Sequence, residues 1–189
     1  LVGDGWRIDP DRLSVAIDDT TRLILFCNPH NPTGRVFDAD EVAAVADAAE
    51  RHDLLVITDE IWGDLVHPGA VHRPLATCDE RFRGRLVTLG SASKTFNLAV
   101  AHLDHEPLLE SLEAMPRHLQ GSPGSLGVVG TIAAWTECDD WLAAVRRTIV
   151  ARRDQLTRRL ERDAPSVRLD SPESTYLAWL DFRDTHLGD

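Results

Sequence analysis

Three short runs of apolar residues organise the first half of the chain. They cover residues 23–27, 54–57 and 86–89. Apolar runs of this length, without alternating polar positions, are typical of strands that are covered on both faces in a parallel sheet. Between the first two runs, Asp38 and Glu41 have the spacing of a helix-capping pair, and apolar residues then recur at helical spacing to about Arg51. The order strand, helix, strand predicts a βαβ crossover, and therefore an α/β fold with a parallel sheet.

The second half of the chain has a helical pattern. A short helix is predicted between Pro107 and Pro116, a small-residue helix over 126–136 and a long helix over 139–162. Residues 166–169 and 175–180 then have the pattern of two strands that begin a second, smaller unit. These changes of pattern divide the chain into residues 1–105, 106–165 and 166–189.

Charge and composition narrow the class of partner. The formal net charge of -11 argues against a nucleic acid or an anionic membrane surface, because the summed field repels polyanions. Arginine pairs on the long helix could favour nucleic acid, but acidic neighbours make a solvated helix face the better interpretation. No apolar run approaches membrane-spanning length. The start of the chain lacks a signal-peptide pattern and the three cysteines are far apart, so we expect a cytoplasmic protein with reduced thiols.

Polar residues follow each predicted strand. The turn-rich stretch 28–35 follows the first strand, Asp59 the second, and Lys94 the third. Because ligands bind beyond the carboxyl ends of parallel strands, these features predict a site on one edge of the sheet. A lysine there can condense with an aldehyde. The structural alternatives are that Asn28 and Asn31 only form turns, that Asp59 caps a helix and that Lys94 is solvated.

One further pair has metal-ligand spacing. His102 and His105 are three residues apart, but no third ligand is evident, so we expect no metal site.

Three strings together resemble a known family. Asn-Pro-His-Asn-Pro-Thr-Gly at 28–34, Asp-Glu-Ile at 59–61 and Ser-Ala-Ser-Lys at 91–94 are similar in order and spacing to the class I/II aminotransferases, which are fold-type I enzymes dependent on pyridoxal phosphate (PLP). The strings at 64–69 and 175–181 resemble more closely the cystathionine β-lyase-like C–S lyase branch. The resemblance covers nearly the whole chain, whereas the chain resembles only about the middle half of a complete family member.

The resemblance implies a fold and a domain organisation. It implies a three-layer large domain, with a mostly parallel sheet flanked by helices, followed by the start of a small α+β domain. Residues 1–105 would be part of the PLP-binding large domain, 106–165 its helical remainder with the connecting helix, and 166–189 the beginning of the small C-terminal domain.

The resemblance also implies roles for individual residues. Lys94 would form the Schiff base with the cofactor aldehyde and later act as general base on the Cα proton. Asp59 would pair with the pyridine nitrogen and keep it protonated. Asn31 would donate its amide to the phenolate oxygen of the ring. Ser91 and Ser93 would offer their hydroxyls to the phosphate.

The chain departs from the family pattern in three ways. The arginine that clamps the cofactor phosphate is missing, since the chain runs from Asn97 through Val100 to His102 without it. Trp62 occupies a cofactor-binding position that is usually tyrosine in the aminotransferases and often histidine in the lyases. The segments that supply the ring-stacking residue and the arginine for the substrate carboxylate are absent.

Three functions follow as hypotheses. The first is a PLP-dependent C–S β-lyase, which would convert a sulfur-containing amino acid into a thiol, pyruvate and ammonia and would work as a homodimer. The second is a PLP-dependent aminotransferase. The third is a truncated relative without activity, acting at most as an interaction module.

Overall fold

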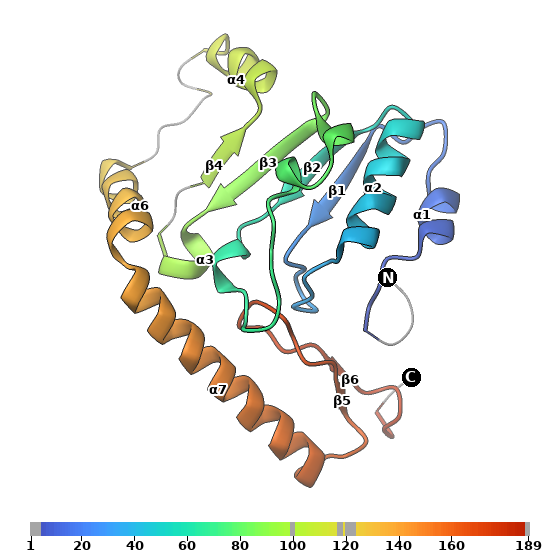
Figure 1. The fold of residues 1–189 in the computed structure, drawn as a ribbon, viewed down its shortest axis with the longest axis vertical. Coiled ribbons are helices and arrows are strands. Elements are labelled where there is room, and N and C mark those ends of the chain that lie inside the picture. Colours follow the sequence, from blue (N-terminus) through green and yellow to red (C-terminus); the bar gives the residue numbers. More distant parts are fainter. Residues whose placement is uncertain (1–4, 99–100, 117–118, 120–123, 188–189) are drawn as a thin grey trace.

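A four-stranded sheet forms the centre of the molecule in the computed structural model, which describes residues 5–98, 101–116, 119 and 124–187. Its strands are β1 (Leu23–Cys27), β2 (Leu55–Asp59), β3 (Leu86–Ser91) and β4 (Ala101–Asp104), in the spatial order β1-β2-β3-β4 (Figure 1). The first three strands pair in parallel, as predicted, and β4 is antiparallel to β3. The sequence did not predict β4, because its four residues contain neither an apolar run nor β-branched side chains.

The main core lies between the sheet and α2 (Ala39–Arg51). This helix begins with a complete capping box between Asp38 and Glu41, which confirms the predicted capping pair. Its buried face packs with strand and loop residues into one cluster, made up of Phe26, Phe37, Val42, Val45, Ala46, Ala49, Val56, Leu75 and Phe82. A short helix near the start, α1 (Pro10–Ala16), packs on α2 (Figure 1).

The connection from β2 to β3 contains three short 3-10 helices instead of an α-helix. They are η1 (Gly63–Leu65), η2 (Leu75–Thr77) and η3 (Glu80–Phe82). Leu65, Leu75 and Phe82 are the buried residues of these turns, so each turn is held by one apolar side chain. After β3, the single-turn helix α3 (Ser93–Phe96) ends at Asn97, whose φ of 56° lies in the left-handed region that suits a helix end.

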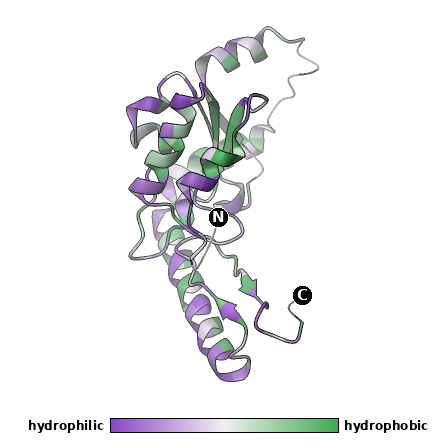
Figure 2. Ribbon diagram, turned by 90° about the vertical axis from the view of Figure 1, so that its right-hand side faces the viewer, coloured by the Kyte–Doolittle hydropathy of each residue, from purple (hydrophilic) through white to green (hydrophobic). Residues whose placement is uncertain are grey.

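The helices predicted for the second half are confirmed as α4 (Glu106–Glu113), α6 (Ser125–Glu137) and α7 (Asp139–Asp163). The sheet is largely apolar, whereas α7 alternates between polar and apolar residues along its length (Figure 2). Among the helices within the described ranges, none combines the length and the apolar character needed to cross a membrane.

The end of the chain differs from the prediction. Only β5 (Arg168–Leu169) and β6 (Leu180–Asp181) form a two-stranded antiparallel ladder, so the expected strand over 175–180 is wrong for most of its length. Thr175, the first residue of that stretch, is fully buried with a φ of 70°, a left-handed conformation that does not belong to a strand.

Residues 172–175 instead dock on loops from the first half of the chain. The backbone N–H groups of Glu173 and Ser174 donate to the Gly34 carbonyl at 2.9 and 2.8 Å. Gly34 has a φ of +72°, and a Cβ there would lie 2.4 Å from the Cβ of Pro172. The glycine of the Asn-Pro-His-Asn-Pro-Thr-Gly string therefore permits this close approach.

Candidate active site

The carboxyl ends of β1, β2 and β3 form the edge on which the predicted site residues lie. Cys27 is paired with Asp59, and Asp59 with Leu89, so the three strands end side by side. The backbone N–H of Asn28 donates to the Asp59 carbonyl at 3.0 Å and continues this ladder into the loop. Parallel pairing thus brings residues from three distant parts of the sequence to one edge.

Lys94 lies in the single turn of α3, directly beyond the end of β3. Its Nζ is 5.6 Å from the centroid of the Trp62 ring, within cation–π range. Lys94 is also the only lysine among the 189 residues of the chain. Every other side-chain cation at neutral pH is an arginine or a histidine, so Lys94 is the one side-chain amine that can react with an aldehyde.

The Trp62 ring contacts both the Lys94 amine and Tyr176, a residue from the last part of the chain. The Trp62 side chain is 2% exposed, and its ring meets Tyr176 edge-on at 4.8 Å between centroids. Tyr176 is the only tyrosine in the chain. The sequence did not single it out, although it lies in the string at 175–181 that carries part of the family resemblance.

Asp59 is half-buried at the end of β2. Its Oδ1 accepts the backbone N–H of Ile61 at 3.1 Å. The carboxylate therefore closes a local turn. This is close to the structural alternative that Asp59 caps a helix, except that the capped element is a turn. The same turn leads the chain towards Trp62.

The two serines of the third string lie together at the start of α3. Ser91 is 8% exposed, and its Oγ accepts the backbone N–H of Ser93 at 3.0 Å. Ser93 is half-buried in the same turn as Lys94. The small side chains allow this tight passage from strand to helix.

The loop after β1 separates its two asparagines. Asn28 is buried, and its Oδ1 accepts the N–H of Phe37 at 3.1 Å, so it holds the loop closed. Asn31 is exposed, and among the described residues no hydrogen bond joins its side chain to Asp59 or Lys94. His30 contacts Thr33 Oγ1 at 2.7 Å through Nδ1, and burial, with a smaller contribution from Arg35, lowers the pKa of its imidazole.

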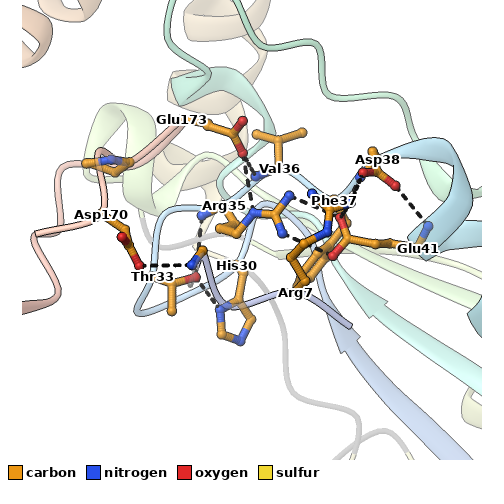
Figure 3. A network of polar contacts seen from close by, with 12 residues as sticks. Arg7, His30, Thr33, Arg35, Val36, Phe37, Asp38, Glu41, Asp170 and Glu173 are labelled. Carbon is orange, nitrogen blue, oxygen red and sulfur yellow. Dashed lines mark hydrogen bonds and ion pairs between the residues drawn. The ribbon is translucent and has the colours of Figure 1, made fainter. Parts of the chain in front are cut away.

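A polar network fastens this loop to α2 and to the end of the chain (Figure 3). The Glu41 carboxylate is 4% exposed and accepts two bonds from the Arg35 guanidinium, both at 3.0 Å. It also accepts the backbone N–H of Ile8 at 2.9 Å. Arg35 approaches Glu173 at 3.7 Å, and Glu173 accepts the N–H of Val36 at 2.9 Å. No pattern in the sequence indicates this pairing, apart from the presence of Arg35 at the end of the stretch 28–35.

Two predictions fall partly outside the described residues. The phosphate-clamping arginine was expected near Val100, which lies outside the described residues. His102 is described only as part of β4. His105 caps α4, because its Nδ1 accepts the N–H of Leu108 at 3.1 Å. Within the described ranges, no group of three or more His, Cys, Asp or Glu residues has an arrangement that could hold a metal ion.

Comparison with known proteins identifies the family of this chain. The family model for aminotransferase class I and II matches residues 2–187. Cystathionine beta-lyase PatB from Bacillus subtilis is 29% identical over all of this chain and 51% of its own length. The chain thus spans about half the length of the curated relatives that it matches.

Solved structures give the same fold. The PLP-bound C–S lyase from Staphylococcus hominis has a TM-score of 0.85 at 32% identity, over 93% of this chain and 46% of the other. N-Succinyldiaminopimelate aminotransferase from Mycobacterium tuberculosis has a TM-score of 0.81 at 34% identity, over 94% and 47%. With a family model that matches almost every residue, the chain belongs to the PLP-dependent class I and II aminotransferase family.

Proposed function

We propose that this chain carries the cofactor-binding edge of a PLP-dependent C–S β-lyase acting on a sulfur-containing amino acid. The observation that carries the proposal is the position of Lys94, the only lysine of the chain. Its amine lies over the Trp62 ring, just beyond the end of β3, and β3 pairs with the strand β2 that ends at Asp59. The similarity to proteins named as cystathionine β-lyase and C–S lyase supports this reaction class.

The chemistry of the donor set fits PLP. The cofactor has an aldehyde, a basic ring nitrogen, a phenolate oxygen and a phosphate. In the proposal, Lys94 bonds to the aldehyde, Asp59 pairs with the ring nitrogen and Asn31 donates to the phenolate oxygen. Ser91 and Ser93 donate their hydroxyls to the phosphate, and Trp62 packs beside the amine.

When bound, PLP supplies an electron sink that makes the Cα proton of an amino acid acidic. Lys94 then has two roles: its amine holds the cofactor, and once substrate displaces it, it takes the proton from Cα. The Asp59 carboxylate keeps a proton on the ring nitrogen through a charge-assisted hydrogen bond, a contact worth about 1.5–3 kcal/mol. Loss of the thiol from Cβ would leave an enamine of the substrate, and hydrolysis of this enamine by one water would give pyruvate and ammonia.

An aminotransferase is the second candidate. The observation that favours it is the 34% identity to N-succinyldiaminopimelate aminotransferase, which is slightly above the identity to the C–S lyase structure. The two reactions share the proton removal by Lys94 and differ in where that proton goes next. In a transferase, Lys94 would return the proton, and no thiol would leave.

Cofactor binding is tested by incubating the chain with PLP and recording the absorbance of the lysine-bound cofactor. We expect a band that disappears in Lys94→Ala, and borohydride reduction followed by peptide mapping should place the cofactor on Lys94. The α-amine of the protein tested is the internal control, because it is also a primary amine. Absence of a Lys94-dependent band would overturn the cofactor site and favour the inactive interaction module.

The reaction is tested with cystathionine as substrate. Release of pyruvate, lost in Lys94→Ala, supports the lyase. Transfer of the amino group to a keto acid without pyruvate would instead establish the aminotransferase. We also propose a homodimer as the active form, and sedimentation of the PLP-loaded chain tests this against a monomer.

A further inference from the structure

A second polar pair lies behind the candidate site, on the turn that carries Trp62. His72 Nε2 is 3.2 Å from Glu60 Oε2, and both side chains are only 9% exposed. His72 comes from the loop before η2, twelve residues after Glu60. Glu60 directly follows Asp59 at the end of β2, and its carboxylate contacts His72 and the Leu75 backbone.

Glu60 is held by several donors. Its Oε1 accepts the backbone N–H of Leu75 at 2.8 Å, and the Thr58 hydroxyl lies 3.4 Å from the same oxygen. Its own backbone N–H donates to the Leu89 carbonyl at 3.0 Å, which ties the residue to β3. A buried carboxylate of this kind is stable only while it is hydrogen-bonded, so these contacts fix the beginning of the turn after β2.

His72 also supports the next part of the turn sterically. A Cβ on Gly63 would lie 3.0 Å from Cδ2 of His72, so the imidazole ring packs directly against the Gly63 backbone. The N–H of Gly63 donates to the Glu60 carbonyl at 2.8 Å. Trp62 therefore lies between two residues that are both in contact with His72.

One nitrogen of the His72 imidazole has no hydrogen-bond partner among the described residues. This nitrogen is Nδ1, and it is buried. A buried nitrogen without a partner costs stability, and a leucine of similar size would avoid this cost. The histidine therefore has to be explained by what its other nitrogen and its ring hold in place.

We propose that His72 is a positioning residue for the cofactor site: through Glu60 and Gly63 it fixes the turn that presents the Trp62 indole to the Lys94 amine. The importance of this turn for chemistry rests on the proposed function, whereas its geometry does not. Without His72, Glu60 loses a partner and Gly63 loses its packing contact. Trp62 then loses its fixed orientation over the amine, which is 5.6 Å from its ring.

The first measurement needs no cofactor. In the 15N-labelled full chain, the indole N–H resonance of Trp62 can be identified among the five tryptophans by its loss in Trp62→Phe. We expect His72→Leu to shift this resonance and His72→Gln, which can still donate to Glu60, to restore it. Leu75→Ala is the matched control, because it removes a fully buried side chain beside the pair but keeps the backbone N–H that Glu60 accepts.

The second measurement uses the PLP-loaded chain. The visible circular dichroism of Lys94-bound PLP, per mole of cofactor bound, reports how the site orients the cofactor, which a mere loss of stability does not change. We expect His72→Leu to reduce this signal and to weaken PLP binding by about tenfold, as the loss of outer-shell partners does at metal sites. Leu75→Ala should lower the unfolding midpoint and leave the signal per bound cofactor unchanged.

The outcomes separate the two proposals. If Leu75→Ala and His72→Leu change the Trp62 resonance alike, or if His72→Leu leaves it unchanged, the positioning role is refuted. If His72→Leu fails to fold, Glu60→Gln carries the same test, because it changes the carboxylate and keeps the ring. If the unmodified chain shows no absorbance band of Lys94-bound PLP, the proposed function is refuted. The Trp62 indole resonance then still decides whether His72 fixes the orientation of Trp62.

Discussion

The helices α2 and α7 differ in how the fold uses them. The 13-residue α2 has six buried residues and a complete capping box. The 25-residue α7 has no buried residue, and Cys138 at its start provides no side-chain cap. Both have an apolar stripe at helical spacing in the sequence. An apolar stripe therefore predicts a helix, but it does not determine how much of that stripe the fold will bury.

The difference follows from what each helix contacts. α2 lies on the sheet, and its Glu41 holds the loop of the candidate site through Arg35. α7 contacts the loops through arginines, such as Arg146, whose Nε donates to the Asp64 carbonyl at 2.6 Å. Because tertiary packing supplies most of the stability of a helix in a protein, substitutions on α2 should cost more than equivalent ones on α7.

The largest effect is expected at Glu41. Replacing it by alanine leaves the Arg35 guanidinium, only 13% exposed, without its bidentate partner, and should lower the free energy of unfolding by about 3–5 kcal/mol. Asp47→Ala in the same helix breaks solvent-accessible ion pairs with Arg51 and Arg81 and should cost about 1 kcal/mol or less. Urea unfolding of both variants measures the difference. Equal losses would show that the buried pair does not hold α2 to the loop.

A smaller effect is expected from paired valine substitutions. Val45 on α2 is 2% exposed, so Val45→Ala should cost about 2 kcal/mol through lost burial and a residual cavity. Val145 on α7 is half-buried, and the better helix propensity of alanine offsets part of its loss, so Val145→Ala should cost less than about 1 kcal/mol. If Val145→Ala costs as much as Val45→Ala in the same denaturation assay, α7 is packed more firmly than its exposure indicates.

The smallest effect is a pH dependence at His30, in the loop packed against α2. Burial lowers its pKa in the folded chain below the ordinary value of 6.5. As the pH falls below that value, the unfolded chain binds a proton before the folded one does. The contribution of His30 to stability is therefore complete at neutral pH and is lost as the pH falls through 6.5 towards the folded-state pKa.

This dependence can be isolated by measuring unfolding free energies between neutral and mildly acidic pH. His30→Gln should flatten the decline with falling pH. His52→Gln, at the exposed end of α2, is the matched control and should leave the decline unchanged. A decline that persists in full in His30→Gln would assign it to another group.

Local patterns predicted the elements well. The three apolar runs became β1, β2 and β3, and Asp38 with Glu41 became the capping box of α2. These predictions succeeded because a strand or a cap depends on residues close together in the sequence. For the site, the same local logic located Asp59 and Lys94 at strand ends, and their assigned roles stay predictions.

Contacts between distant segments could not be predicted in this way. The docking of residues 172–175 on Gly34 and the packing of Tyr176 on Trp62 each join segments more than a hundred residues apart. The same holds for Arg35 with Glu173. No periodicity in one sequence indicates such pairings, since they depend on how every intervening loop directs the chain.

The sequence by itself determined an α/β sheet with polar residues after each strand, because hydrophobic patterning and turn chemistry act over a few residues. It also determined that one lysine is available for amine chemistry. Only the tertiary structure decided that this lysine lies over Trp62, and that Glu60 and His72 support the turn behind it. The physical reason is that burial and hydrogen bonding between distant segments set the orientation of a side chain, whereas the local sequence sets only the element that carries it.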